Sequence, residues 1–286
     1  MPTLPVIANE RYVASNMKQI MGTMKGIAMS SFVEVKKKRE KRFDRFTTSF
    51  DSFFQLADHT KAKSPFVQPD SATICVIAIT SNESFMAGLN NKVIKVARDK
   101  VENRPCHFVI TGPRMIGRLK QEKVPYTIFP GFRDKNMHDV ATQIKDFVTQ
   151  KVREKEFGKV IAVYADPVSL STQEIRAVTL LPAHDVYPQN EETKPDKDEL
   201  FCQESHIDAI MEYLTEIWVI YKLIALFQDN KLSEYAAQAM QLDGSLQNLE
   251  ELEKRLKLQF VKTRRELIDA SLRETVTAMM VNSPGR

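Results

Sequence analysis

Each end of the chain carries a long stretch without proline in which apolar residues recur in alternating steps of three and four. In the first stretch the apolar positions are Val13, Met17, Ile20, Met24 and Ile27. This is the spacing of a coiled-coil seam. No proline, which would break a helix, occurs between Pro5 and Pro65. The pattern predicts one helix from about Asn9 to Ala57, roughly 70 Å long.

A second stretch of the same kind begins near Ser205 and continues almost to the C-terminus. Pro284 is the first proline after Pro195. The apolar positions here are Ile207, Ile210, Leu214, Ile217, Tyr221, Ile224, Leu242, Leu246, Leu249, Leu252, Leu256, Phe260, Leu267 and Leu272. An unbroken helix over this stretch would be on the order of 110 Å long. Asp243-Gly244-Ser245 is its weak point, because glycine costs about 1 kcal/mol relative to alanine.

Helices of this length need a partner. The average globular helix has only about a dozen residues, and an apolar stripe must be buried against something. The other end of the chain offers that partner, so the sequence predicts a long antiparallel coiled coil of the N- and C-terminal helices.

The segment between the two helices has a different rhythm. Thr73–Thr80 is a nearly continuous apolar run, as expected for a strand buried on both faces. The other predicted elements are strands at Cys106–Thr111, Val124–Phe129, Val160–Ala165 and Glu174–Leu181, and helices at Gly88–Glu102, Pro113–Glu122 and Asn136–Lys155. This alternation indicates an inserted Rossmann-like α/β domain with a largely parallel sheet, followed by an exposed loop at Pro182–Glu199. The predicted domains are residues 1–60, 61–200 and 201–286.

Composition and motif spacing argue against several classes of function. The formal net charge of +4 is too small to indicate a nucleic-acid partner. Cys75, Cys106 and Cys202 lack CxxC spacing, and the five histidines are scattered without metal-ligand spacing. The turn after the first strand lacks both GxGxxG and GxxxxGK[ST]. We therefore expect no catalytic residue, no cofactor site and no metal site on this chain.

One motif resembles a known family. Residues 79–90 read ITSNESFMAGLN, which is similar to the pattern I-[ST]-S-D-R-G-L-C-G-G-L-N of the gamma subunit of the rotary F-type ATP synthase. The matching part of this α/β-domain loop includes Ser81, Gly88, Leu89 and Asn90, whereas residues 82–87 depart from the pattern.

Three further stretches carry the resemblance from about residue 11 to residue 280. Residues 18–31, KQIMGTMKGIAMSS, resemble Q-K-I-T-K-A-M-K-M-V-A-A-S-K. Residues 233–237, SEYAA, resemble S-E-x-A-A. Residues 260–276, FVKTRRELIDASLRETV, resemble Y-N-K-A-R-Q-x-x-I followed by L-T-E-I-V. Gln238, Ala270 and Arg273 replace the family's usual Arg, Gln and Thr. The chain is identified as a divergent member of the gamma-subunit family.

The resemblance implies a central rotor shaft that couples proton-driven rotation to ATP synthesis. Its expected partners are the alpha and beta subunits of the catalytic head, an epsilon/delta-type small rotor subunit and the membrane c-subunit ring. No nucleic acid and no direct small-molecule substrate are expected. The chain would be a non-catalytic subunit of a proton-transporting two-sector ATP synthase. It would lie peripherally on the mitochondrial inner membrane (matrix side) or the bacterial inner membrane (cytoplasmic side).

The same resemblance implies which residues of the shaft contact the catalytic head. They are Ile20, Met24, Lys25, Lys36, Lys37, Lys38, Gln238, Lys262, Arg264, Ile268, Leu272, Glu274 and Val276. The basic residues of the first helix are expected to face acidic levers of the catalytic subunits. Met279, Met280 and Val281 are expected to lie in an apolar bearing.

Two other functions are compatible with parts of the sequence. A coiled-coil scaffold or adaptor with an α/β domain would self-associate rather than enter an ATPase head. A Rossmann-like nucleotide-binding enzyme would bind a ligand at a glycine-rich turn, which this sequence does not have.

Overall fold

The computed structural model describes residues 3–40, 64–67, 69–86, 88–102, 104–115, 117, 124–182 and 207–281. They belong to two compact units, which we describe separately. The coiled-coil unit comprises Met1–Met29 and Ala239–Arg286, and the sheet unit comprises Ser30–Gln238. Each of the two long helices contributes residues to both units.

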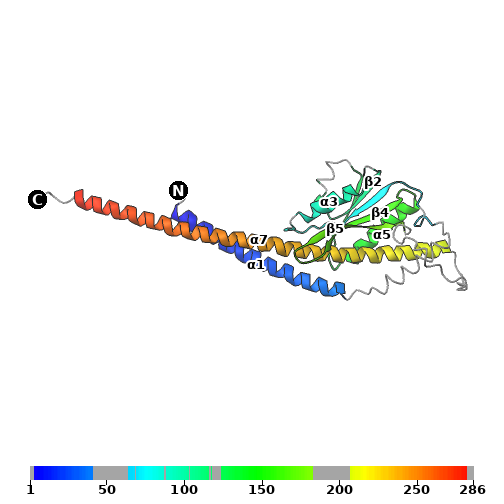
Figure 1. Ribbon diagram of the computed structural model, residues 1–286, viewed down its shortest axis with the longest axis horizontal. Helices are drawn as coiled ribbons and strands as arrows, with labels where there is room; N and C mark the ends of the chain where they lie inside the picture. The colour runs from blue at the N-terminus through cyan, green and yellow to red at the C-terminus, as the bar shows by residue number, and fades with distance from the viewer. Residues whose placement is uncertain are drawn as a thin grey trace. The chain divides into compact units, whose positions relative to one another are not determined.

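The predicted terminal helices are confirmed within the described residues (Figure 1). Helix α1 spans Leu4–Glu40 and α7 spans Ile207–Val281, which are 37 and 75 residues long. Helix α1 begins before Asn9 because a proline in a first helical turn, here Pro5, sacrifices no hydrogen bond. The predicted continuation of the first helix from residue 41 to Ala57 lies outside the described residues.

Helix α7 is unbroken at Gly244, so the predicted weak point does not interrupt it. Leu242, only 2% exposed, lies within one turn of the glycine. Packing of a helix face supplies more stability than intrinsic propensity does, and it outweighs the cost of one glycine.

The prediction of which apolar residues form the seam of α1 is wrong. Val13, Met17, Ile20, Met24 and Ile27 are between 36% and 62% exposed. The buried residues of α1 in the coiled-coil unit lie one position further along, at Ile7, Ala14 and Ala28. Sequence periodicity missed this seam because lysines and arginines alternate with its apolar residues. Their long aliphatic stems can line an interface while the charge stays solvated.

The sheet unit contains a five-stranded sheet of order β3-β2-β1-β4-β5. The strands are β1 (Ile74–Ala78), β2 (Cys106–Thr111), β3 (Tyr126–Phe129), β4 (Lys159–Pro167) and β5 (Gln173–Leu181). All neighbouring pairs are parallel except β4 and β5, which are antiparallel. The predicted largely parallel sheet with an added edge strand is therefore confirmed.

Helices cover both faces of this sheet. Alternate residues of β1 point to opposite faces, so Val76 and Ala78 pack in the core that includes α3 (Leu89–Asp99). Cys75 and Ile77 pack in the core that includes α5 (Met137–Arg153) and α7. Helix α7 is thus part of the α/β core as well as of the coiled coil.

Two predicted elements are only partly described. The helix expected at Pro113–Glu122 appears as the short 3₁₀ helix η1 (Pro113–Met115), and residues 118–123 lie outside the described chain. Most of the loop expected at Pro182–Glu199 also lies outside it, since residues 183–206 are not described.

Candidate functional site

The motif residues after β1 form a folded turn. The Ser81 backbone N–H donates to Asn90 Oδ1 at 3.1 Å, and Asn90 Nδ2 donates to the Ser81 carbonyl at 2.7 Å. Gly88 precedes α3 with a φ of 76°, a conformation that favours glycine. Leu89 is buried with Met86. The motif residues therefore hold the turn against α3.

The side chains of Arg114 and Gln238 hydrogen-bond to the divergent part of this loop. Arg114 donates to the carbonyl of Asn82 at 3.0 Å, to the carbonyl of Glu83 and to Ser84 Oγ at 3.1 Å. Gln238 Nε2 donates to the Ser84 carbonyl at 3.1 Å. The substituted residue Gln238 thus contacts the substituted loop, a relation that sequence analysis did not predict.

Two glycines make room for the Asn82 side chain. A Cβ atom on Gly112 would lie 2.5 Å from Asn82 Oδ1, and one on Gly131 would lie 2.5 Å from Asn82 Nδ2. Gly112 also has a φ of +85°. These glycines follow β2 and β3, so three neighbouring strands meet at Asn82.

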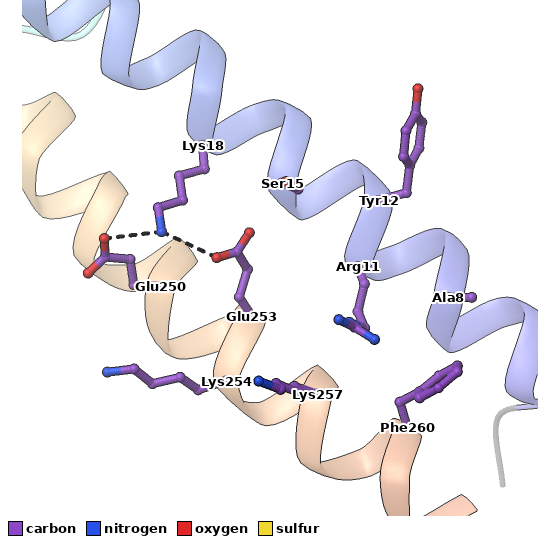
Figure 2. Close-up of a pocket in the computed structure, with 10 residues that line it drawn as sticks. All are labelled: Ala8, Arg11, Tyr12, Ser15, Lys18, Glu250, Glu253, Lys254, Lys257 and Phe260. Atoms are coloured by element: carbon purple, nitrogen blue, oxygen red, sulfur yellow. Dashed lines mark hydrogen bonds and ion pairs between the residues drawn. The ribbon is translucent and has the colours of Figure 1, made fainter. Parts of the chain in front are cut away.

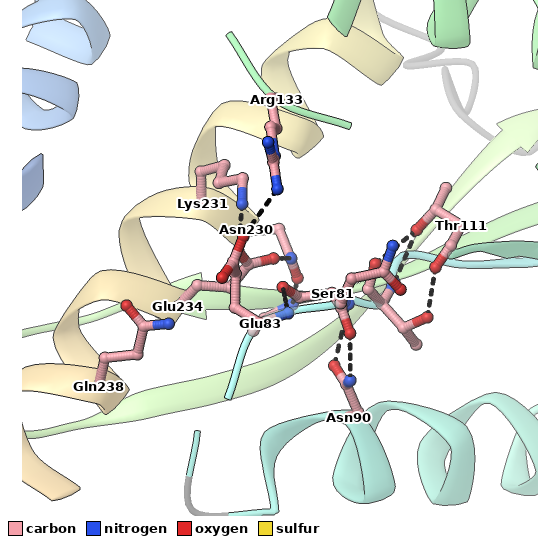
Figure 3. Close-up of polar contacts among 12 residues, drawn as sticks. Ser81, Glu83, Asn90, Thr111, Arg133, Asn230, Lys231, Glu234 and Gln238 are labelled. Atoms are coloured by element: carbon pink, nitrogen blue, oxygen red, sulfur yellow. Dashed lines mark hydrogen bonds and ion pairs between the residues drawn. The ribbon is translucent and has the colours of Figure 1, made fainter. Parts of the chain in front are cut away.

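Helix α7 fills the crevice at the carboxyl ends of β1 and β4. Strand order reverses between these strands, and α/β enzymes bind nucleotides at such a point. Here Asn230 Oδ1 accepts the Ala165 N–H at 3.0 Å, and Ser233 Oγ donates to the Ala165 carbonyl at 2.9 Å. Glu234 accepts from Asn230 Nδ2 and from Lys231 Nζ, both at 2.7 Å. Figure 3 shows this network beside Ser81.

The ion pair in this network is deeply buried. Lys231 is 4% exposed and Glu234 is 1% exposed. Burial raises the pKa of the Glu234 carboxyl, and the interactions with Lys231 and Ser81 oppose that rise. The Lys231 ammonium also lies 5.6 Å from the ring centre of Phe132 and 5.7 Å from that of Tyr235. Side chains of α7 therefore take the place that a nucleotide would need.

A second charged cluster links α1 to the sheet and to α7 within the sheet unit. Arg39 Nε lies 2.8 Å from Asp229 Oδ1, and an Arg39 terminal nitrogen lies 3.9 Å from Asp166 Oδ1. Arg176 also binds Asp166, at 2.9 Å. Both aspartate side chains are 9% exposed. Burial, together with these two carboxylates, raises the pKa of Tyr164 to about 12.

In the coiled-coil unit, cations of α1 contact α7. Lys18 Nζ lies 3.2 Å from Glu250 and 3.3 Å from Glu253, and Lys25 Nζ lies 2.5 Å from Asp243. The Arg11 guanidinium lies 5.3 Å from the ring centre of Phe260. Figure 2 shows Lys18 between the two glutamates and Arg11 above Phe260, at a groove of about 800 Å³.

The predicted shaft contacts are divided between the two units: Lys36, Lys37, Lys38 and Gln238 belong to the sheet unit and the others to the coiled-coil unit. Ile20, Ile268, Leu272 and Val276 are large apolar residues between 49% and 60% exposed. Met24, Lys36, Lys37, Lys262, Arg264 and Glu274 are exposed. Some of the predicted residues have partners within the chain, since Lys25 pairs with Asp243, Lys38 with Asp134 at 2.6 Å, Lys262 with Glu266 at 4.0 Å, and Gln238 with Ser84. The role of these residues in contacting a catalytic head stays a prediction.

Arg114, Asn230 and Lys231 were not predicted as site residues, and Arg39 was predicted only as one of the first-helix cations that face a catalytic subunit. The available signal was a cluster of polar residues, Asp229 to Glu234, in a helix stretch that is otherwise apolar.

Within the described ranges, no helix combines the length and apolar character needed to cross a membrane. The same ranges contain no cluster of three or more His, Cys, Asp or Glu residues suited to a metal ion.

Comparison with known proteins identifies the family. The family model described as "ATP synthase" matches residues 4–280 of this chain. The ATP synthase gamma chain of Clostridium beijerinckii is 26% identical over 210 residues, which covers 72% of this chain and 71% of the relative. The gamma chain of Maridesulfovibrio salexigens is 22% identical over 291 residues and covers 96% of this chain and 97% of the relative.

Solved structures share the fold over almost the whole chain. A chain of the mitochondrial ATP synthase of Euglena gracilis aligns with a TM-score of 0.71 at 16% identity, covering 99% of this chain and 97% of that one. A rotor chain from another rotational state of the same enzyme aligns with a TM-score of 0.66 at 17% identity, covering 93% and 98%. These structures show the shared fold, and the family match over residues 4–280 shows that the chain belongs to the ATP synthase family, in which the two relatives compared above are gamma chains.

Proposed function

We propose that this chain is the central rotor shaft of a proton-translocating F-type ATP synthase and couples proton-driven rotation to ATP synthesis. The observation that carries the proposal is an uncovered apolar surface on a long helix. From residue 264 to residue 280 every residue of α7 is exposed, including Leu267, Leu272, Met279 and Met280. Exposed apolar surface of this extent marks an interaction site.

The proposed partners of this surface are the alpha and beta subunits of a catalytic head. Each orientation of the shaft would present different side chains to each catalytic subunit. Differential contact of this kind shifts the population of a subunit's conformations and hence its affinity for nucleotide. The sheet unit would bind an epsilon/delta-type small rotor subunit and the membrane c-subunit ring.

The chain would transmit torque without performing chemistry. Its α/β layer has the strand order of a nucleotide-binding fold, but Asn230, Ser233 and Glu234 of α7 occupy the crevice at the strand reversal. This occupancy favours the shaft over the Rossmann-like enzyme.

The expected location is peripheral on an energy-transducing membrane. The mitochondrial inner membrane on its matrix side and the bacterial inner membrane on its cytoplasmic side both fit the proposal. Fractionation of source cells with a tagged chain distinguishes the two.

Native mass spectrometry of the tagged chain from gently solubilised membranes tests the function. We expect one copy with three alpha and three beta subunits, whereas a homodimer without them would refute the shaft and favour a coiled-coil scaffold. Ile268→Ser should reduce retention of the head during salt washing. Val168→Ser is the matched control, because Val168 is 52% exposed and Ile268 is 50% exposed. Equal retention in both variants would contradict the proposed role of Ile268.

A further inference from the structure

The inward face of α1 in the coiled-coil unit alternates cations with apolar residues. Arg11, Lys18 and Lys25 are spaced seven residues apart, and so are the apolar positions between them, Ile7, Ala14, Met21 and Ala28. In a heptad these are the two positions that face the partner helix. One of the two inward positions is thus cationic in three successive heptads.

Each cation has a partner on α7, and the partners run in the opposite direction along the chain. Arg11 contacts Phe260, Lys18 contacts Glu250 and Glu253, and Lys25 contacts Asp243. Glu250 and Glu253 raise the pKa of Lys18. Within the sheet unit Arg39, two heptads after Lys25, binds Asp229 in the same way.

Two of the four inward apolar positions specify the register weakly, whereas Ile7 is fully buried in the cluster with Leu256. Ala14 and Ala28 are buried, at 3% and 4% exposure, and alanine offers little shape for an opposing helix to recognise. At these two alanines a slide by one heptad would therefore replace one shallow contact by another. Polar residues at inward heptad positions, in contrast, are known to fix register at some cost in stability.

The charges oppose a slide in one direction. A slide that moves Lys18 from Glu250 to Lys257 brings like charges together and moves Arg11 towards Arg264, while Lys25 moves from Asp243 to Glu250. A slide in the other direction moves Lys18 to Asp243 and Arg11 towards Glu250 and leaves Lys25 beside Ala236, so the number of ion pairs is unchanged.

We infer that this ionic ladder, Arg11, Lys18 and Lys25 with their partners on α7, opposes the slide that would bring Lys257 to Lys18 and holds the two helices together. The inference concerns the chain alone and stands whether or not the chain rotates. Because the pairs are only partly buried, their contribution falls as salt is added, so the cohesion of the coiled-coil unit depends on ionic strength.

Disulfide trapping in the full-length chain tests the ladder, in a background with its native cysteines replaced. Ala14 and Leu256 pack in one cluster, so the pair Ala14→Cys with Leu256→Cys reports the native register. Leu249→Cys and Thr263→Cys, each with Ala14→Cys, report slides of one heptad in the two directions.

We expect cross-linking at position 256 only, with a yield that falls between about 0.05 M and about 1 M salt. The reversals Lys18→Glu and Lys25→Asp should lower that yield and raise cross-linking at position 263, because the carboxylate introduced at position 18 would then attract Lys257. Adding Glu250→Lys, Glu253→Lys and Asp243→Lys should restore the native pattern. An unchanged pattern in the reversed variant, or failure of the partner reversals to restore it, would overturn the inference.

The single tryptophan separates loss of the ladder from general misfolding. Trp218 is 5% exposed and lies in the core of the sheet unit. A reversed variant that keeps native Trp218 fluorescence while losing the cross-link at position 256 supports the ladder. If every loss of cross-linking is accompanied by loss of that fluorescence, the residues serve general folding and the inference fails.

Discussion

Replacing either member of the buried ion pair Lys231–Glu234 should destabilise the sheet unit, with opposite dependence on pH. In Lys231→Met the Glu234 carboxyl loses its cation and is expected to bind a proton instead. Protonating a carboxyl of ordinary pKa, 4.5, costs about 3.4 kcal/mol at pH 7, because each pH unit is worth about 1.36 kcal/mol. This cost is the upper limit on the decrease in the free energy of unfolding, and the decrease should nearly vanish as the pH falls to about 4.5.

Glu234→Gln removes the carboxylate of the pair and should show the opposite dependence on pH. The amide retains the acceptor for Asn230 but leaves the Lys231 ammonium buried without a carboxylate. Neutralising a lysine of ordinary pKa, 10.5, costs about 4.8 kcal/mol at pH 7. The Phe132 and Tyr235 rings lower that upper limit by stabilising the cation. The loss should shrink as the pH rises, because less work is then needed to remove the proton.

The wild-type pair adds its own pH dependence. Because burial raises the pKa of Glu234, the folded state binds a proton more readily than the unfolded state. The contribution of Glu234 to the free energy of unfolding is therefore fully present below the pKa of Glu234 in the unfolded chain. It declines as the pH rises from there through the higher pKa of Glu234 in the folded chain.

Urea unfolding followed by Trp218 fluorescence at several pH values measures these effects. We expect the double variant Lys231→Met with Glu234→Gln to recover much of either single loss, because it removes both charges. Parallel pH dependence of the two single variants, or losses below about 0.5 kcal/mol in both at pH 7, would refute the reasoning, since changes that small are ordinary for surface positions.

Two further predictions concern the neighbouring contacts. Arg39→Met should lower the free energy of unfolding by about 3 kcal/mol in the same assay, because it leaves Asp229 buried without that cation. Adding Asp229→Asn should recover part of this loss. Strict additivity of the two changes would contradict the pairing. Gly112→Ala should destabilise by about 1 kcal/mol or more through its positive φ and its approach to Asn82, whereas Asn82→Gly in the same chain should relieve only the steric part. A Gly112→Ala variant as stable as wild type would show that the loop adjusts freely.

Helices and strands were predictable where a single spacing of apolar residues dominates the sequence. The absence of proline between Pro195 and Pro284 and the repeating leucines predicted α7, and the apolar run at Thr73–Thr80 predicted β1. The seam of α1 was not predictable in this way. Its inward positions include Arg11, Lys18 and Lys25, so a search for apolar spacing selects the adjacent, exposed face.

The contacts of the candidate site depend on residues far apart in the sequence. Arg114 reaches the carbonyls of Asn82 and Glu83, and Gln238 reaches Ser84 across 154 positions of the chain. Neither side chain carries a local pattern that names its partner. Such pairs follow from the order of strands and the path of α7, which a single sequence does not specify.

The filled crevice connects the fold to a mechanical role. A parallel α/β sheet leaves an opening where strand order reverses, and an enzyme uses that opening for a ligand. Here α7 places Asn230 and Ser233 on the backbone of Ala165 and buries Glu234 beside Lys231. A helix whose side chains hydrogen-bond to the backbone of Ala165 resists both sliding and rotation against the sheet. Because α7 continues into the coiled-coil unit, force applied to the sheet can pass along one covalent helix, and the ladder on α1 couples the second helix to it.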